Sequence, residues 1–490
     1  MRDLAALPKA HLHLHFTGSM RPSTLLDLAE RYRVRLPPAL LDADPLRVPS
    51  TERGWFRFQR LYDAARACVR SGDDMRRIVD EAAEDDAAEG SGRLEIQVDP
   101  TSYAPFLGGI TPAVELVLDA AREASARHGL EVAVVVAASR LKHPLDARTL
   151  ARLATRYAGD RPGQVVGFGL SNDERRGDTQ EFAHAFRIAA RAGLASVPHG
   201  GELLGPAHVS EVVGALRPDR LGHGVRSAED PALLAGLVEA GVALEVCPAS
   251  NVSLGVYEDL GDVPLPSLVA AGATVALGAD DPLLFRSRLV DQYETARHVH
   301  GFDDDALADL ARASVRASRA SGATKRRLLA GVDTWLAQDP ADEGTPDERP
   351  PATRDRPRLP DTAVRAAATP GRRARRGRAP RAGRQAAADP GSRHGPRPRG
   401  RDRGPRLPGA RGRGRRRDPA TRGDGRRRRR ARRHDPGAAR GGRPGRRRAR
   451  GGAGRRGGRR HRPRRPALSL TRPRGPGGAW TSRDAAAHVL

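Results

Sequence analysis

The first 340 residues of this 490-residue chain alternate short apolar runs with longer segments in which apolar residues recur at helical spacing. The short runs are rich in Val, Leu or Ala, which is typical of strands buried on both faces of a parallel sheet. The predicted strands cover residues 11–16, 93–98, 131–137, 165–170, 195–198, 220–222, 243–246 and 274–278. The clearest predicted helices cover residues 111–128, 179–192, 232–240 and 266–271.

Eight alternations of strand and helix in this length predict an α/β fold, a (β/α)₈ TIM barrel over residues 1–340. Such barrels carry their functional sites at the carboxyl ends of the strands. One connection is longer than the others, and we expect this insert, residues 22–77, to contribute helices over the mouth of the barrel. Its aromatic cluster between Trp55 and Tyr62 fits either the packing of that cover or a platform for a ligand.

Three histidines alternate along the first predicted strand. Because side chains in a strand repeat with a period of two, this spacing predicts that His11, His13 and His15 share one face. A half-buried strand that happens to carry histidines is one interpretation. The other is a transition-metal site, because imidazole is the commonest metal ligand and suits zinc, iron or nickel.

Three further polar clusters stand where later apolar runs end. They are His199-Gly200-Gly201-Glu202, Gly222-His223-Gly224 and Asp280-Asp281-Pro282. Taken alone, His223 between glycines is typical of a turn, and Glu202 could merely cap the next helix. Together with the histidines of the first strand, these residues place metal-ligating side chains at four predicted strand ends.

Composition changes abruptly near residue 340. Residues 1–340 hold 39 Lys and Arg against 47 Asp and Glu, a net charge of −8, whereas residues 341–490 hold 47 against 12, a net charge of +35. The net charge of +27 therefore originates in this Arg/Pro/Gly-rich tail. The tail has a single aromatic residue, Trp480, and no Lys, Ile, Phe, Tyr or Met, so it cannot build a core and is predicted to be disordered.

Two explanations of residues 341–490 stay open. A GC-rich reading frame translated out of phase gives this mixture of Arg, Gly, Pro and Ala, which makes the tail a frameshift artefact. A genuine basic arm is the alternative, and its arginine run at residues 426–430 would permit binding to RNA or DNA. Such an arm lacks the aromatic side chains that stack on bases.

The barrel region carries both cysteines of the chain, Cys68 and Cys247. Two cysteines in this length give no disulfide framework, which fits a reducing compartment. The chain has no secretory signal pattern and no apolar run near the roughly 20 residues that span a bilayer. We therefore expect a cytoplasmic protein without a membrane span.

The order of these motifs resembles that of the adenosine deaminase family of metal-dependent hydrolases over residues 7–337. The matching elements are Pro8-Lys9, His13-Leu14-His15, His199-Gly200-Gly201-Glu202, Gly222-His223-Gly224, Cys247-Pro248 with Ser250-Asn251, and Asp280-Asp281-Pro282. The resemblance implies a barrel of the metal-dependent hydrolase type. It also implies hydrolytic deamination of a 6-aminopurine nucleoside, with adenosine converted to inosine and ammonia.

By this resemblance, His13, His15, His199 and Asp280 would bind one zinc ion per chain. Zinc with an open coordination position lowers the pKa of its water toward about 7, and the resulting hydroxide would attack C6 of the purine. Zinc is the default for three imidazoles and one carboxylate, and iron is the other candidate. His11 is not a ligand in the family and is expected either to support a ligand from behind or to have a structural role.

The resemblance also assigns roles around the substrate. Glu202 would handle the proton at purine N1, and His223 would hydrogen-bond the attacking hydroxide. Asp281 would bind N7, the loop at Asn172 would contact N3, and His15 would line the substrate pocket as well as bind the metal.

Thr17, expected beside the sugar, departs from the family pattern. It stands where the family usually has an acidic residue that contacts the ribose hydroxyls, and this loss could admit a bulkier 5′ substituent. Deamination of a 5′-modified adenosine such as 6-aminodeoxyfutalosine is therefore the alternative function. A nucleic-acid-binding protein that acts through the basic tail is the alternative from a different class.

Overall fold

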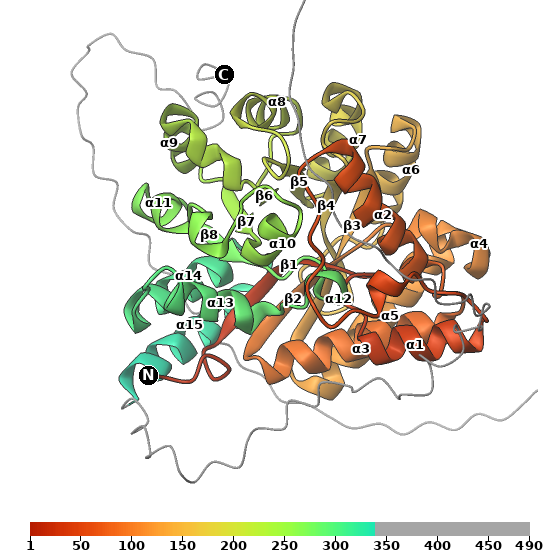
Figure 1. Cartoon of the computed structure of the whole chain (residues 1–490), viewed down its shortest axis with the longest axis horizontal. Coiled ribbons are helices and arrows are strands. Elements are labelled where there is room, and N and C mark those ends of the chain that lie inside the picture. The colour runs from red at the N-terminus through yellow and green to blue at the C-terminus, as the bar shows by residue number, and fades with distance from the viewer. Residues whose placement is uncertain (339–490) are drawn as a thin grey trace, which may run out of the picture. The chain divides into compact units, whose positions relative to one another are not determined.

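The computed structural model describes residues 1–338, so the tail expected over residues 341–490 lies outside the described part. Eight strands run parallel, and each pairs with the next along the chain (Figure 1). They are β1 Lys9–His15, β2 Ser91–Val98, β3 Glu131–Ser139, β4 Val165–Ser171, β5 Ala195–Gly200, β6 Arg220–His223, β7 Ala243–Val246 and β8 Val275–Leu277. All eight predicted strands are confirmed, with ends that agree within two residues.

The first and last strands meet at the carboxyl end of the sheet. Leu14 and Asp280 form a parallel bridge at this point. The backbone N–H of His15 donates to the carbonyl of Asp280 at 3.0 Å, and the N–H of Asp280 donates to the carbonyl of His13 at 3.0 Å. These bonds join the end of β8 to β1, so the sheet closes into the predicted barrel.

Helices alternate with the strands around the outside of the sheet (Figure 1). The four predicted helices are confirmed as α5 Ile110–His128, α7 Thr179–Arg191, α9 Pro231–Glu239 and α11 Leu265–Ala270. The other long helices after residue 70 are α3 Gly72–Ala88, α6 Pro144–Thr155, α8 Pro206–Leu216, α13 Leu289–His298, α14 Asp304–Ala317 and α15 Gly322–Ala337. The short helices in the loops are α4 Ala104–Leu107, α10 Pro248–Ser253 and α12 Pro282–Phe285.

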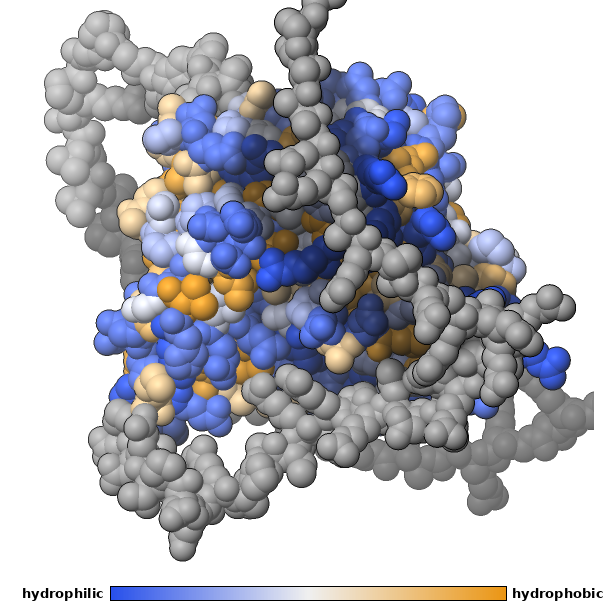
Figure 2. Space-filling model, viewed as in Figure 1, coloured by the Kyte–Doolittle hydropathy of each residue, from blue (hydrophilic) through white to orange (hydrophobic). Residues whose placement is uncertain are grey.

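These helices are amphipathic, and their apolar faces pack on the sheet. In α7, for example, Phe182, Ala185, Phe186 and Ala189 are buried at helical spacing. On the face drawn in Figure 2, hydrophilic residues cover the outer helices, and hydrophobic residues are visible in small areas between them. The apolar spacing that predicts the helices therefore also determines which side of each one meets the barrel.

The insert after β1 contributes a cover to the functional end of the barrel. It contains α1 Pro22–Arg31 and α2 Glu52–Arg66, and α2 begins where the Thr51 hydroxyl accepts a hydrogen bond from Gly54 N. Phe58 of α2 stacks on Phe285 of α12, with ring centroids 5.7 Å apart and planes at 16°. Because α12 directly follows β8, this stack fixes α2 beside the carboxyl ends of the strands.

The prediction that the three histidines of β1 share one face is wrong. Pairing between β1 and β2 shifts register between His11 and Leu14, which is the signature of a β-bulge. His11 Nδ1 lies 2.9 Å from Asp86 Oδ1 on α3, whereas His15 Nδ1 lies 3.1 Å from Gln97 Nε2 on β2. The imidazole of His11 therefore contacts a helix through Nδ1, while its Nε2 lies 3.1 Å from the carbonyl of His13 and from Ala279 N.

Charged side chains occupy part of the barrel interior. Along β2, Glu95 and Gln97 alternate with Leu94 and Ile96, which belong to the main hydrophobic core. Glu95 Oε2 accepts a hydrogen bond from Arg220 Nη2 of β6 at 2.7 Å.

Both cysteines are buried and unpaired. Within residues 1–338, no helix combines the length and the apolarity needed to cross a membrane.

Candidate active site

Two strands and the loop after β8 bring the predicted metal ligands together at the carboxyl end of the barrel. His13 and His15 come from β1, His199 from β5, and Asp280 directly follows β8. Asp280 Oδ1 lies 3.1 Å from His15 Nε2 and 3.5 Å from His13 Nε2. The ring centroid of His199 lies 4.9 Å from that of His13 and 5.2 Å from that of His15. These four side chains form one cluster.

His223, at the end of β6, lies in the same cluster. Its ring centroid is 4.8 Å from that of His13 and 5.1 Å from that of His199. The ligand atoms of His13, His199 and His223 all lie within 4.8 Å of one another, as do those of His13, His15 and Asp280. Ligand atoms of Glu202, His223 and Asp280 form a third such group, so the three groups overlap in one continuous cluster.

Two residues of the cluster have strained backbones. His223 has φ of 63° and Asp280 has φ of 61°, in the left-handed region that residues with a side chain rarely adopt. Strained residues of this kind persist where the surrounding structure fixes them, and they gather at functional sites. Here the left-handed conformation turns the chain at each strand end, while the side chains of His223 and Asp280 remain in the cluster.

Glycines make room for the imidazoles. A Cβ atom on Gly222 would lie 2.6 Å from Cδ2 of His199 and 3.0 Å from Cε1 of His13. On Gly278 it would lie 2.7 Å from Cβ of His13. Real Cβ atoms essentially never approach so closely, so side chains at these two strand ends would displace the histidines.

Several polar atoms of the cluster have no hydrogen-bond partner although they are buried. These atoms are Nε2 of His13, Nδ1 of His199 and both ring nitrogens of His223. Buried polar groups are nearly always satisfied, so orphans that converge on one point indicate a missing partner. Imidazole nitrogens beside a carboxylate form the donor set of zinc sites, and the cluster therefore fits a transition-metal ion.

The charges of the cluster are coupled. Burial favours neutral His13, but the carboxylates of Asp280 and Glu245 outweigh it and raise the pKa of His13 to about 10. Burial also opposes ionisation of Asp280, yet its contacts with the imidazoles of His13 and His15 hold its pKa well below the usual range. The pKa of His223 falls to about 3, chiefly because the ring is buried. Asp280 is therefore the anionic group of the cluster.

Glu202, predicted to handle a proton, lies beside these rings. Its Oε2 is 3.6 Å from His199 Nδ1, and its Oε1 is 3.8 Å from His223 Nε2. Burial, followed by the negative charges of Glu174 and Asp280, raises the pKa of Glu202 well above the ordinary value. The raised pKa favours the protonated form of Glu202, which can donate a proton to a ring nitrogen.

Glu174, in the loop after β4, holds the segment that carries Glu202. Its carboxylate oxygens accept hydrogen bonds from the backbone N–H groups of Glu202 at 3.1 Å, Leu203 at 2.8 Å and Leu204 at 2.8 Å. Three N–H groups that converge on one buried carboxylate fix the backbone at the end of β5. Glu202 is thus positioned by a residue 28 positions earlier in the chain.

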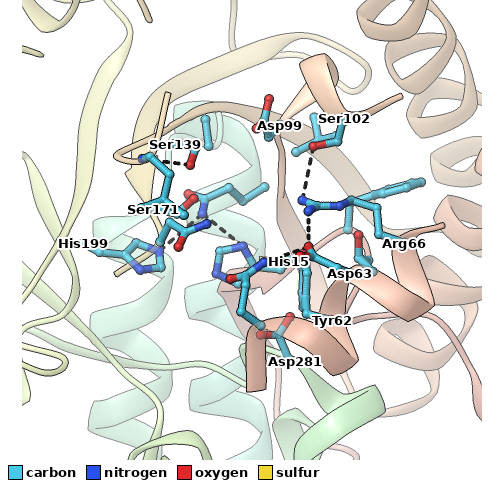
Figure 3. A pocket seen from close by; sticks show the side chains of 18 of the residues that line it. His15, Tyr62, Asp63, Arg66, Asp99, Ser102, Ser139, Ser171, His199 and Asp281 are labelled. Atoms are coloured by element: carbon cyan, nitrogen blue, oxygen red, sulfur yellow. Dashed lines mark hydrogen bonds and ion pairs between the residues drawn. The ribbon is translucent and has the colours of Figure 1, made fainter. Parts of the chain in front are cut away.

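Asp281 projects into the same pocket from the loop after β8 (Figure 3). Its Oδ1 is buried without a partner. Burial, followed by repulsion from Asp280, raises the pKa of Asp281 well above the ordinary value. A Cβ atom on Gly18 would lie 1.8 Å from Oδ1 of Asp281, so glycine is needed there. In its protonated form Asp281 can donate a hydrogen bond to a ligand.

One pocket collects most of the residues predicted for the site (Figure 3). His15, Thr17, Asn172, His199, Glu202, Asp280 and Asp281 all line it. His13 and His223 do not line the pocket but contact residues that do. Asn172 has φ of 83°, a left-handed conformation that favours glycine and that Asn tolerates better than most residues.

The pocket also contains residues that the sequence did not single out. Gln97 bonds the rings of His15 and His199 at 3.1 and 3.3 Å, and Thr17 Oγ1 lies 2.5 Å from Tyr103 Oη. Gln97 is a polar residue that alternates with apolar ones at the end of a strand, so its position carried a usable signal. Tyr103 lies in a loop, where no periodicity marked it.

A model of the family described as adenosine deaminase matches residues 8–335. The chain belongs to the adenosine deaminase family. This deaminase is 63% identical over 336 residues to a putative adenosine/adenine deaminase of Streptomyces virginiae, a match that covers 68% of this chain and 98% of the relative. It is therefore a purine deaminase, a hydrolase that acts on a carbon–nitrogen bond.

Two other relatives of the deaminase have different substrates in their names. An adenine deaminase of Sinorhizobium fredii is 34% identical over 328 residues, 67% of this chain and 99% of the relative. An aminodeoxyfutalosine deaminase of Streptomyces coelicolor is 35% identical over 339 residues, 68% of this chain and 86% of the relative.

Solved structures share the barrel of this deaminase. An adenine deaminase from Arthrobacter aurescens has a TM-score of 0.62 and 30% sequence identity, and the match covers 68% of this chain and all of that one. An amidohydrolase from Burkholderia ambifaria with bound zinc has a TM-score of 0.60 at 24% identity, covering 68% and 94% of the two chains. At that identity the second likeness shows the fold alone.

Proposed function

We propose that this chain catalyses the zinc-dependent hydrolytic deamination of a 6-aminopurine nucleoside, converting adenosine to inosine and ammonia. The observation that carries the proposal is the cluster of His13, His15, His199 and Asp280 beside the buried carboxyl group of Glu202. A metal site and a protonated acid on one wall of a pocket match the needs of hydrolysis at C6 of a purine.

His13, His15, His199 and Asp280 would hold one zinc ion. The unpartnered nitrogens of His13 and His199 and the anionic Asp280 support this set, and an amidohydrolase of the same fold contains zinc. Ser250 Oγ donates to Asp280 Oδ2 at 2.6 Å and restrains that carboxylate. When bound, zinc supplies Lewis acidity that generates a nucleophile from water at neutral pH.

The side chains of the pocket would bind and activate the base. Glu202, whose pKa burial raises, would donate a proton to N1 as oxygen from water adds to C6. Asp281 would donate a hydrogen bond to N7, and the backbone at Asn172 would contact N3. His223 would orient the attacking water. The C6–N6 bond then breaks. Of the two water protons, one returns to Glu202 in place of the proton given to N1, and the other leaves in ammonia.

The residues at the far end of the pocket would determine which substituent on purine N9 can bind. Thr17, two residues after the end of β1, supplies a hydroxyl held by Tyr103 and no carboxylate for the ribose. Polar groups remain at the rim, where Lys142 Nζ donates to Asp99 Oδ2 at 2.8 Å and Arg66 Nη1 donates to Ser102 Oγ at 3.2 Å. These charged and hydroxyl groups can contact a sugar, which favours a nucleoside over the free base.

Deamination of a 5′-modified adenosine such as 6-aminodeoxyfutalosine is the second candidate function. The loss of the carboxylate at Thr17 favours it, and the 35% identical aminodeoxyfutalosine deaminase supports it. Adenine is a third substrate to be tested, because a 34% identical relative is an adenine deaminase.

Ammonia release by the zinc-loaded full chain, measured with adenosine, adenine and 6-aminodeoxyfutalosine, tests the proposal. We expect the highest kcat/KM with adenosine and no release after the metal is removed by a chelator. A preference for 6-aminodeoxyfutalosine would replace the proposed substrate and make Thr17 a specificity residue. Absence of release from all three would contradict the proposed function.

A further inference from the structure

A chain of buried ionic groups leads from the candidate metal site into the barrel. His13 Nδ1 lies 2.9 Å from Glu245 Oε2, at the end of β7. Glu245 Oε1 accepts from Arg220 Nε of β6 at 2.5 Å, and Arg220 Nη2 donates to Glu95 Oε2 of β2 at 2.7 Å. All four side chains are at most 3% exposed. Such groups remain buried only because each is paired.

The contact with Glu245 determines the tautomer of His13. In the neutral form of His13, which is the form that binds a metal, Nδ1 carries the hydrogen and donates it, because a carboxylate can only accept. The lone pair of Nε2 then faces the cluster, where Nε2 lies 3.5 Å from Asp280 and has no hydrogen-bond partner. The imidazole therefore presents its free nitrogen to the point where a metal ion fits.

His13 differs from the other imidazoles of the cluster in the partner of its outer ring nitrogen. The neutral amide of Gln97 contacts Nδ1 of His15 and Nε2 of His199, and both ring nitrogens of His223 lack a partner. Among these four residues, all in the described part of the chain, only His13 has a carboxylate on the nitrogen opposite the cluster. Ionic partners at that position orient metal-binding histidines and increase their basicity.

We propose that Glu245 is a positioning residue for the metal site, which holds His13 in the ligating tautomer and orientation and strengthens its bond to the metal. The inference rests on the proposed function, in which His13 is a ligand. Arg220 acts through Glu245, because its guanidinium balances the buried carboxylate and fixes it in place.

A purely structural role for the same ion pairs is the competing explanation. Arg220 Nη1 donates to the carbonyl of Ala317 at the end of α14, and Glu95 Oε1 accepts from Arg319 N at 2.6 Å. The network therefore also ties the C-terminal helices to the barrel. Glu95 separates the two explanations, since it shares Arg220 with Glu245 and is equally buried but does not contact a candidate ligand.

The test compares Glu245→Gln with the matched variant Glu95→Gln in the full chain. The zinc dissociation constant is measured by competition with a chromophoric chelator, and the unfolding midpoint is measured after metal removal. We expect Glu245→Gln to weaken zinc binding about 10- to 100-fold, the usual effect of losing such a partner. Glu95→Gln should keep the zinc affinity of the unsubstituted chain, while both variants lower the unfolding midpoint.

Zinc affinity unchanged in Glu245→Gln, or lowered equally in both variants, would overturn the inference. If a Gln variant does not fold, Glu245→Asp and Glu95→Asp replace the pair, because Asp keeps the charge and moves the carboxylate by one methylene. The weaker zinc binding is then expected in Glu245→Asp alone, and equal zinc affinities would overturn the inference. An unsubstituted chain that binds zinc but releases no ammonia would contradict the proposed function and leave the role of Glu245 standing.

Discussion

Glu202 shows how the environment of one residue sets its chemistry. The side chain is 2% exposed, and burial together with nearby carboxylates raises its pKa. A solvated glutamate would be ionised at neutral pH and could not donate a proton to a purine nitrogen. The sequence placed Glu202 three residues after His199, but its raised pKa follows from its burial and from the carboxylates that the fold gathers around it.

Replacing this carboxyl group should separate chemistry from metal binding. We expect Glu202→Gln to bind zinc with the stoichiometry of the unsubstituted chain and to lose about two or more orders of magnitude in kcat, the scale of a lost general acid–base group. Steady-state ammonia release and metal analysis measure the two effects. Glu211→Gln, at an exposed position on α8, is the matched control and should change neither. Turnover retained in Glu202→Gln would contradict its role.

At the scale of the elements, the junction between α1 and α3 depends on one aspartate. Asp74 forms a capping box with Ser71 at the start of α3. Its Oδ2 also accepts from the backbone N–H of Arg70 at 2.9 Å and from Tyr32 Oη, beyond the end of α1, at 2.7 Å. Burial opposes ionisation of Asp74, but these hydrogen bonds outweigh it and lower its pKa. The carboxylate therefore ties the insert to the first barrel helix.

The sign of the pH effect follows from this lowered pKa. Ionised Asp74 stabilises the folded chain above the unfolded-state pKa near about 4, and the gain is lost as pH falls through the lower folded-state pKa. We expect Asp74→Asn to reduce the free energy of unfolding at pH 7 by about 1 kcal/mol, the typical worth of a helix cap. The deficit should shrink in urea unfolding below pH 4. Exposed Asp73→Asn is the control, and a pH-independent deficit would contradict the assignment.

At the scale of the whole molecule, the site residues lie within the part of the chain that matches the family. The family model covers residues 8–335, while the excess positive charge lies beyond residue 340. We propose that residues 1–340 form the functional unit. A net charge of −8 on that part offers no electrostatic attraction to nucleic acid, whereas +35 on the remainder would.

Truncation after Pro340 tests this division. We expect residues 1–340 to keep the kcat/KM of the full chain for adenosine, because all the candidate site residues are retained. Binding to a labelled DNA duplex, measured by fluorescence anisotropy at two salt concentrations, should occur with the full chain only and weaken as salt rises. A truncated chain that folds but loses deamination would contradict the proposal, as would equal DNA binding by both chains.

The sequence by itself determined the barrel, because apolar periodicity is a local pattern and the eight apolar runs that predict strands can be identified in the sequence. It also determined where the metal-type residues would meet, since parallel strands in a closed barrel bring their carboxyl ends to one face. Motif order then identified the family. These inferences need only short-range patterns and the topology that the patterns imply.

Tertiary structure decided the contacts that depend on register and distance along the chain. A bulge in β1 turned His11 toward Asp86 although strict alternation predicted otherwise. Glu245 meets His13 across 232 residues. No pattern in the neighbouring sequence predicts the room that glycines leave for the histidines at the strand ends. The same holds for the loop that brings Glu174 to the backbone of Glu202. Each of these contacts joins elements that are far apart in the sequence. Which residues of two such elements lie side by side depends on the register between the paired strands, and sequence periodicity carries no information on that register.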